Sequence, residues 1–247
     1  MAEFENYQVL EKFPFAGELL EAVPYGSGHI NDTYRLTFRE DGKEVQYILQ
    51  RINGEIFRDQ DQLMENIERV TSFIAGKIRL QGGNPDRETL QVIRTVDGHP
   101  YYRDETGHGW RVYPFITDSA SFDKAESAED FKQSGYAFGN FQYFLADFPA
   151  KELHETIPNF HNTVDRFAKF RKAVEADVMG RAAQVQEEIH FVMEREQDCH
   201  FFGDLLEAGE LPLRVTHNDT KLNNILIDRE TGKAICVIDL DTVMPGF

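Results

Sequence analysis

Four polar residues close to the end of the chain have the types and the spacing that a chemical site requires. A loop that reads His-x-Asp-x-x-x-x-Asn contains Asp219, Lys221 and Asn224, and Asp239 ends the apolar stretch that follows. Asp219 can orient an alcohol and accept its proton, and Lys221 can place a point charge beside a phosphate. Asn224 and Asp239 offer the hard oxygen ligands that Mg²⁺ prefers. The spacing is typical of phosphoryl transfer from ATP, with the first two residues catalytic and the last two as metal ligands.

A different interpretation of the loop is a capped turn, in which Asp219 and Asn224 only bind backbone N–H groups. The surrounding sequence favours the chemical interpretation, because the loop lies between two apolar segments and a turn and a strand then lead to Asp239. His217 is best explained as a structural residue that supports the loop. Asp241 is either a second acid at the metal site or a hydrogen-bonding residue, and the second is favoured because Asp239 has the expected spacing.

Composition limits the class of protein. The chain has 247 residues, of which 41% are hydrophobic, and this is enough for one globular domain or two lobes. The 43 acidic and 26 basic residues give a net charge of −17, which argues against binding to nucleic acid or to an anionic membrane. No segment has the length of a membrane-spanning helix, the N-terminus has no export signal, and two cysteines are too few for a disulfide framework. We therefore expect a cytoplasmic protein.

The apolar pattern predicts a β-rich part followed by a mainly helical part. An amphipathic helix is expected over residues 59–78, and a hairpin turn over residues 40–43. The expected strands are Arg35–Phe38, Val45–Ile52, Gln91–Val96, Tyr101–Arg103 and Trp110–Phe115, and the later helices are Ser127–Phe148, Thr163–Asp177 and Arg181–Asp198. We predict an α+β fold of two lobes. Residues 1–116 form a nucleotide-binding lobe with a five-stranded antiparallel sheet and a helix, and residues 117–247 form a mainly helical lobe with the catalytic loop.

Two features of the β-rich part are candidates for nucleotide binding. The first is a turn whose glycines let backbone N–H groups approach phosphates, although a plain hairpin explains it about equally well. Its candidate residues are Gly26, Ser27, Gly28, His29 and Asn31. The second is Arg51, which alternation places on one face with Leu49 and which could pair with phosphates and with Glu65 or Glu68 on the helix. A solvated edge arginine is the alternative.

Over nearly its whole length the sequence resembles the aminoglycoside phosphotransferase and choline kinase superfamily, and within it the N-acetylhexosamine 1-kinases. The segments that carry the resemblance are Gly-Ser-Gly-His-Ile-Asn-Asp-Thr-Tyr at 26–34, Leu-Gln-Arg-Ile-Asn at 49–53, Trp-Arg-Val-Tyr-Pro-Phe-Ile at 110–116, Phe-Gly-Asn-Phe-Gln at 138–142, Ile-Pro-Asn-Phe-His-Asn-Thr at 157–163 and Thr-His-Asn-Asp-Thr-Lys-Leu-Asn-Asn at 216–224. The resemblance implies a bilobal protein-kinase-like fold and the use of ATP and Mg²⁺. It also implies an adenine-facing hinge at residues 113–116, with Tyr113 and Phe115, and transfer to the anomeric hydroxyl of N-acetylglucosamine or N-acetylgalactosamine.

The sequence departs from the pattern of this superfamily in three places. Arg51 stands where lysine is frequent, and Asp-Leu-Asp at 239–241 replaces Asp-Phe-Gly. The chain ends six residues after Asp241, so that the resemblance predicts a truncated second lobe. Other interpretations stay open. The acceptor could be choline, another amino alcohol, an aminoglycoside or a different sugar, and the chain could be a non-catalytic nucleotide-binding fragment.

Overall fold

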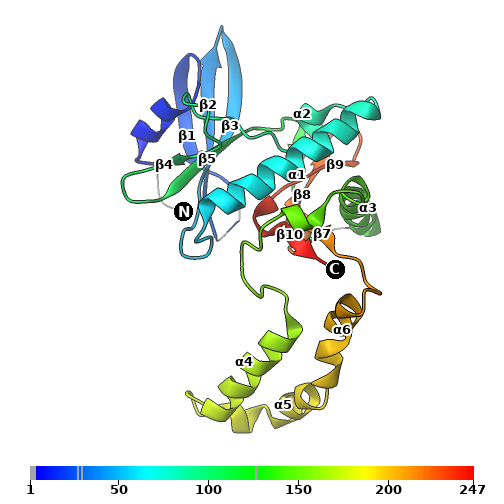
Figure 1. Ribbon diagram of the computed structural model, residues 1–247. Helices are drawn as coiled ribbons and strands as arrows, with labels where there is room; N and C mark the ends of the chain where they lie inside the picture. Colours follow the sequence, from blue (N-terminus) through cyan, green and yellow to red (C-terminus); the bar gives the residue numbers. More distant parts are fainter. Residues whose placement is uncertain (1–3, 27, 29, 126) are drawn as a thin grey trace.

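The largest sheet has five antiparallel strands in the order β1-β2-β3-β5-β4 (Figure 1). A computed structural model describes residues 4–26, 28, 30–125 and 127–247 of the protein. The strands of the sheet are β1 (Glu18–Pro24), β2 (Asp32–Glu40), β3 (Lys43–Arg51), β4 (Tyr102–Arg103) and β5 (Gly109–Pro114). Together with the helices that follow, this sheet makes the fold α+β, as the sequence predicts.

The hairpin of β2 and β3 follows from its two-residue turn. Asp41 and Gly42 both have positive φ, at 48° and 80°, and aspartate followed by glycine is a favoured pair for such a turn. Glu40 pairs with Lys43, and the pairing continues without a shift to Asp32 opposite Arg51. The turn expected at residues 40–43 is confirmed. The sequence predicts it because the turn depends only on adjacent residues.

One predicted strand is wrong, and one strand was missed. The segment Gln91–Val96 makes a single bridge, from Ile93 to Val112, and is not a strand of the sheet. The fifth strand is instead β1, whose register shifts between Leu19 and Glu21. Because a bulge of this kind breaks the alternation of apolar and polar residues, β1 lacks the period of two that identifies a strand in a sequence.

The two faces of the sheet bury different residues. On one face Leu49 and Val112 share a core with Leu36 and with the N-terminal 3₁₀ helix η1 (Tyr7–Lys12). On the other face Tyr113 belongs to the core that contains helix α1 (Gln60–Leu80). Side chains alternate along a strand, so neighbouring residues of β3 and β5 point to opposite faces.

Helix α1 is held at its start by a cap and along its length by burial. The side chain of Asp59 accepts a hydrogen bond from the Gln62 N–H at 3.0 Å. Fully buried apolar residues then recur at helical spacing and face the core, and these include Leu63, Ile67, Val70, Ile74 and Ile78. The helix expected over residues 59–78 is confirmed.

After β5 the chain forms two small sheets and further helices. Strand β7 (Arg214–Thr216) pairs with β10 (Met244–Gly246), and the second sheet has the order β6-β8-β9. Its strands are β6 (Ser119–Ala120), β8 (Ile225–Asp228) and β9 (Ala234–Val237). Helix α3 (Ala128–Phe144) packs on β8 through Phe138, which contacts Ile225 and Ile227. The short helix α2 (Pro85–Glu88) follows α1, and the 3₁₀ turns η2 (Ala150–Glu152), η5 (Leu222–Asn224) and η6 (Leu240–Thr242) connect the other elements.

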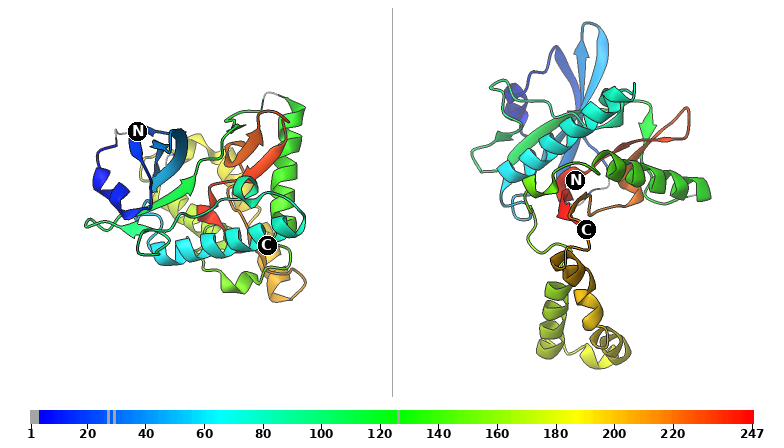
Figure 2. Two further views of the ribbon diagram at one scale, coloured as in Figure 1. Left: turned by 90° about the horizontal axis from the view of Figure 1, so that it is seen from above. Right: turned by 45° about the vertical axis from the view of Figure 1, so that its right-hand side comes forward.

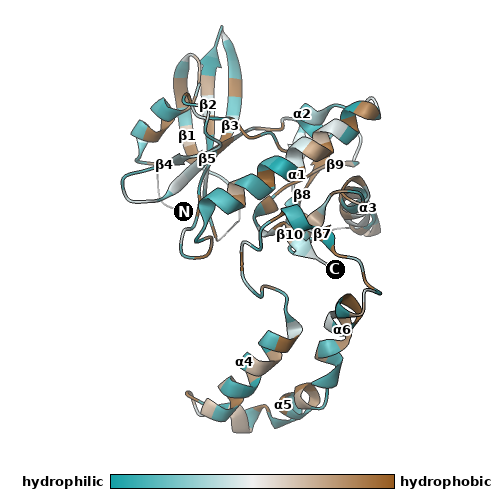
Figure 3. Ribbon diagram, viewed as in Figure 1, coloured by the Kyte–Doolittle hydropathy of each residue, from teal (hydrophilic) through white to brown (hydrophobic). Residues whose placement is uncertain are grey.

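Residues 163–207 form an arm that projects away from the three sheets (Figure 1; Figure 2, right). The arm contains α4 (Thr163–Ala176), η3 (Ala182–Gln184), α5 (Gln186–Met193), η4 (Gln197–His200) and α6 (Phe201–Glu207). The single helix predicted over Arg181–Asp198 is wrong, because the regular helix covers only the span of α5. Many apolar side chains of the arm are exposed, so the helical spacing there does not correspond to a buried face (Figure 3).

Candidate active site

One cavity lies between the five-stranded sheet and the loop after β7. It is lined by most of the residues that the sequence singled out, namely Gly26, Gly28, Asn31, Tyr113, Phe115, Asp219, Lys221, Asn224 and Asp239. Ser27 and His29 lie outside the described residues. The structure therefore brings the first turn, the end of β5 and the polar loop to a single place, although they are far apart in the sequence.

The loop that carries Asp219 is fixed by the residue before it. Asn218 has a positive φ of 64°, which is uncommon for a residue other than glycine. Its side-chain nitrogen donates to the carbonyl oxygen of Thr242 at 2.8 Å and to that of Thr216 at 3.3 Å. These bonds hold the strained backbone in place, so that Asp219 projects from a rigid support.

His217 supports the same loop through two hydrogen bonds. Its Nε2 donates to the carbonyl oxygen of Ile238 at 3.0 Å, and its Nδ1 accepts from the Asp219 N–H at 3.3 Å. The rings of Phe138 and Phe141 pack edge-on against the imidazole. Burial lowers the pKa of His217, which fits the neutral tautomer that these two hydrogen bonds require. His217 therefore has a structural position and connects the loop to the strand before Asp239.

The polar side chains of the loop converge on Asp219. Lys221 Nζ lies 2.8 Å from Asp219 Oδ2, and Asn224 Nδ2 donates to the same oxygen at 3.0 Å. Lys221 Nζ is also 4.0 Å from Asp239 Oδ2, so the ammonium lies between the two aspartates. The arrangement can hold a hydroxyl at Asp219 and a negative group at Lys221 within one small volume.

Asp239 lies near Asn224 because strand β8, which follows Asn224, pairs with strand β9, which ends two residues before Asp239. The Ile238 N–H donates to the Asn224 carbonyl oxygen at 2.9 Å, and Asp239 itself has a positive φ of 58°. Burial and the nearby charge of Asp241 raise the pKa of Asp239 to about 6, against the opposing charges of Arg111 and Lys221. A divalent cation at this position would favour the ionised form again.

The described part of the chain contains no group of three or more His, Cys, Asp or Glu side chains that could hold a metal ion. A cation at Asp239 would therefore need the amide oxygen of Asn224 and oxygens from water or from a ligand. Mg²⁺ commonly binds in this way, through one or two carboxylates together with substrate phosphates and water. The donor set at residues 224 and 239 fits such an ion.

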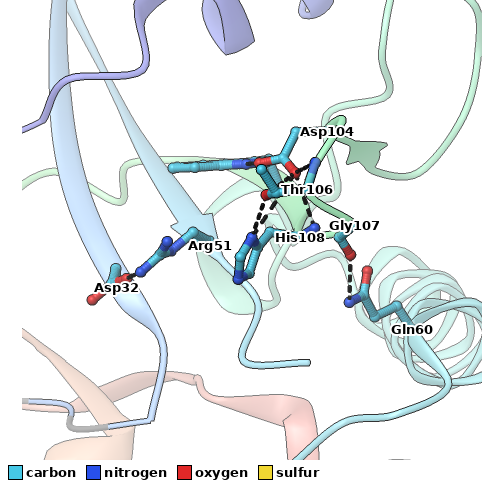
Figure 4. A network of polar contacts seen from close by, with 8 residues as sticks. Asp32, Arg51, Gln60, Asp104, Thr106, Gly107 and His108 are labelled. Atoms are coloured by element: carbon cyan, nitrogen blue, oxygen red, sulfur yellow. Dashed lines mark hydrogen bonds and ion pairs between the residues drawn. The ribbon is translucent and has the colours of Figure 1, made fainter. Parts of the chain in front are cut away.

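Arg51 does not lie where the sequence interpretation placed it. Its Nε donates to Asp32 Oδ2 at 2.7 Å, and it does not line the cavity (Figure 4). Arg51 shares a face of β3 with Leu49, which is buried on the side away from the cavity, while Ile48 and Gln50 line the cavity. Alternation identified the residues that share a face correctly, but it did not identify the face that looks into the cavity.

Neither helix glutamate pairs with Arg51. Glu65 lies 2.6 Å from Arg69 and 2.8 Å from His154 Nε2, and Glu68 lies 2.6 Å from Arg94. The sequence left Glu65 and Glu68 open as partners of Arg51, and in the structure neither is its partner.

The sequence interpretation missed a second arginine, which does face the cavity. Arg111 on β5 is fully buried, and its Nη1 lies 2.6 Å from Asp241 Oδ1. Its Nε and Nη2 both donate to Gln50 Oε1, at 3.0 Å and 2.8 Å. A signal for this residue exists in the sequence, because a charged residue inside the apolar run Trp110–Phe115 requires a buried partner.

Two solved structures are similar to the protein in fold. An aminoglycoside phosphotransferase from Alicyclobacillus acidocaldarius subsp. acidocaldarius DSM 446 has a TM-score of 0.58 and 14% identity, over 100% of this chain and 68% of that chain. A choline kinase from Cryptosporidium parvum Iowa II has a TM-score of 0.54 and 16% identity, over 92% of this chain and 59% of that chain. The protein thus spans only part of the length of each, and the likeness confirms the predicted protein-kinase-like α+β fold.

The described residues contain no helix that combines the length and the apolar character needed to cross a bilayer. A comparison with family models gives a match to the phosphotransferase enzyme family over residues 21–247. The match includes the first turn, the sheet and the complete polar loop. The protein therefore belongs to the phosphotransferase enzyme family.

Proposed function

We propose that the protein is an ATP-dependent kinase of a small molecule and that the acceptor is the anomeric hydroxyl of an N-acetylhexosamine, N-acetylglucosamine or N-acetylgalactosamine. The single observation that carries the kinase assignment is the convergence of Lys221 and Asn224 on Asp219, beside Asp239, in one cavity. The sugar is supported by the sequence motifs alone. In this proposal residues 1–116 are the nucleotide-binding lobe and residues 117–247 the second lobe.

The charges of the cavity support binding of the nucleotide together with a cation. Among its described lining residues the charged ones are Asp219, Asp239, Asp241, Arg111 and Lys221, which leaves one negative charge in excess. Four phosphate charges would be repelled by such a site in the absence of a divalent ion. We therefore expect tight binding of MgATP and weak binding of ATP without metal.

The apolar part of the cavity lining suits an aromatic base. Apolar side chains reach it from the sheet and from β8 and β9, and they include Ile48, Tyr113, Phe115, Leu226 and Ile238. Tyr25 from the first turn packs edge-on against Phe115, with ring centroids 5.5 Å apart. An adenine ring can be buried here while the phosphates extend toward Asp239.

In the proposed reaction the protein acts mainly by positioning. Asp219 orients the acceptor hydroxyl and takes its proton, and Lys221 places positive charge where the transferred phosphoryl group gains negative charge. Asn224 and Asp239 would hold the ion, and bound Mg²⁺ would neutralise phosphate charge. His217 and Asn218 keep Asp219 in place through the hydrogen bonds described above.

A phosphate-transfer assay tests the proposal. With MgATP we expect product from N-acetylglucosamine or N-acetylgalactosamine, and phosphorus NMR should place the phosphate at the anomeric carbon. Choline, glucose and an aminoglycoside belong in the same panel. Transfer to one of them alone would contradict the proposed N-acetylhexosamine acceptor but would still support the kinase assignment. Binding of MgATP without transfer to any acceptor would contradict the kinase assignment.

Replacement of the base gives the sharper test of the site. Asp219→Asn removes the proton acceptor and should lower the rate by about 10³-fold, while the affinity for MgATP changes by less than about 3-fold. Asp204→Asn, on the exposed surface of α6, is the matched control and should leave the rate unchanged. Equal rates for the two variants would remove Asp219 from the mechanism.

A further inference from the structure

A chain of polar contacts among residues that line the cavity connects the sheet to η6. Arg111 on β5 pairs with Asp241 at 2.6 Å and donates two hydrogen bonds to the side-chain oxygen of Gln50 on β3. Gln50 Nε2 donates to Thr33 Oγ1 on β2 at 3.0 Å. Asn31, just before β2, is the other end of the chain of contacts, because its Nδ2 donates to Asp241 Oδ2 at 2.6 Å. All five side chains line the cavity.

Arg111 has the environment of a structural cation and not that of a phosphate ligand. All three of its nitrogen atoms face protein groups, since Nε and Nη2 donate to Gln50 and Nη1 lies against Asp241 and 3.9 Å from Met64 Sδ. The Tyr113 ring covers the guanidinium, with its centroid 5.4 Å from Cζ. A phosphate could reach Arg111 only if the guanidinium left these partners.

Asp241 has a different partner at each oxygen, an ion pair at Oδ1 and a hydrogen bond at Oδ2. Oδ1 faces Arg111 and Oδ2 accepts from Asn31, while the side chain is only 4% exposed. Asn31 is held in turn, because its Oδ1 accepts from the Asn53 N–H at 2.9 Å. The carboxylate of Asp241 therefore has the Arg111 charge beside Oδ1 and a hydrogen-bond donor at Oδ2, although Oδ1 itself accepts no hydrogen bond from a described residue.

The place of this pair in the chain gives it a role. Asp241 follows Asp239 by two residues, and Asp239 has a backbone conformation that residues other than glycine adopt only when their surroundings hold it. Asn31 belongs to the turn that contains Gly28, so the same carboxylate is tied to the glycine turn. The Asp241 side chain thus joins the backbone next to Asp239 to the turn that contains Gly28.

We propose that Arg111 is a positioning residue, which holds Asp241 against Asn31 and thereby fixes the backbone that presents Asp239 to the metal and the turn that covers the nucleotide. The inference rests on the proposed function, since it takes Asp239 as a ligand of the nucleotide-bound ion. The role of Arg111 on β5 therefore differs from the one predicted for Arg51 on β3, because Arg111 holds the carboxylate of Asp241 and pairs neither with the phosphates nor with a helix glutamate.

Thermal melting without nucleotide tests the contact itself. Arg111→Met and Asp241→Asn each leave a buried polar partner unsatisfied, and each should lower Tm by roughly 5–15 °C. The double variant should melt close to the single variants, because the second change removes a group that is already unpaired. The matched control is Arg39→Met, whose partner Glu18 is 73% exposed, and it should change Tm by less than about 2 °C. Additive losses in the double variant would overturn the contact.

Binding of MgADP tests the positioning role, and here variants that keep the fold are needed. Arg111→Lys retains the charge, and Asn31→Ala removes only one side of the contact. Each should raise the Mg²⁺ concentration for half-maximal nucleotide binding by about 10-fold, and Arg111→Lys should add nothing in the Asp241→Asn background.

Two results would overturn this role. A further loss from Arg111→Lys in the Asp241→Asn background would show that Arg111 binds phosphate directly. A Mg²⁺ requirement raised far more by Asp241→Asn than by Arg111→Lys would show that Asp241 is itself a metal ligand. If the unaltered protein fails to bind MgADP, the proposed function fails, whereas the melting experiment still decides whether the contact exists.

Discussion

The cavity region and the arm of residues 163–207 are built in opposite ways. Around the cavity, polar side chains are buried and paired with one another, as in the ion pair of Arg111 with Asp241. In the arm, apolar side chains are exposed, and Val178 and Met179 have 87% and 72% of their surface in contact with solvent. Both regions contain helices, so the type of secondary structure alone does not explain the difference.

The difference lies in where each region finds its stability. Helix α1 is connected to distant segments by Asn66, which is fully buried and bonds to His154 and to the carbonyl oxygen of Val243. The helices of the arm depend on local caps, such as Asn162 at the start of α4 and Asp177 at its end. Residues of the same type should therefore respond very differently to the same change in the two regions, and three matched pairs test this.

The two cysteines give the largest expected contrast. Cys236 on β9 is buried, and burial raises its pKa to about 12, whereas Cys199 in the arm is partly exposed. Since only the thiolate reacts, Cys236 should react with a thiol reagent at pH 8 more than about 10³-fold more slowly than Cys199. Kinetics with a chromogenic disulfide reagent would measure both rates, and Cys199→Ser assigns the fast one.

The raised pKa of Cys236 also has a consequence for stability. In the unfolded chain a cysteine loses its proton near pH 8.5, while folded Cys236 keeps its proton to about pH 12. The folded state therefore binds the additional proton between these values, and this contribution to stability falls as pH rises above 8.5. Rapid labelling of Cys236 at pH 8 without denaturant would contradict the buried position.

The methionine pair is the next largest. Met64 on α1 is fully buried, and Met64→Ala should lower the free energy of unfolding by about 2–5 kcal/mol, because it leaves a cavity in the core. Met179→Ala in the arm should change it by less than about 0.5 kcal/mol, because the side chain is mostly exposed. Denaturation with urea measures both, and a large loss for Met179→Ala would mean that the exposed face of the arm is covered in solution.

The sequence predicts what has a local cause. The turn at Asp41 and Gly42, the start of α1 at Asp59 and the spacing of Asp219 and Asn224 each depend on residues close together in the chain, and the structure has the first two as predicted. The loop residues line one cavity.

Contacts between segments that are far apart in the chain could not be predicted from the sequence. Alternation along β3 cannot identify the face that lines the cavity. The prediction therefore named Arg51, whereas Gln50 and Arg111 line the cavity. The register shift in β1 hides a strand, and helical spacing at residues 181–198 does not show that the face has no partner. Each of these depends on packing against a segment that the local pattern does not identify.

The asparagine pair has the smallest expected contrast and tests the comparison most strictly, because both residues make hydrogen bonds to the backbone. Asn66→Ala leaves two carbonyl groups and one N–H group without partners in a buried place, and it should cost about 3 kcal/mol. Asn162→Ala removes one cap bond, to the Asp165 N–H, at a solvent-exposed helix end, and should cost about 1 kcal/mol.

Hydrogen exchange separates the two asparagine effects by place. Asn66→Ala should speed exchange throughout α1 and in the turn near Val243, since one side chain connects them, while Asn162→Ala should speed exchange only in α4. If Asn162→Ala also speeds exchange in α1, then the arm unfolds together with the cavity region, and the contrast between the two regions is a difference in exposure and not in cooperativity.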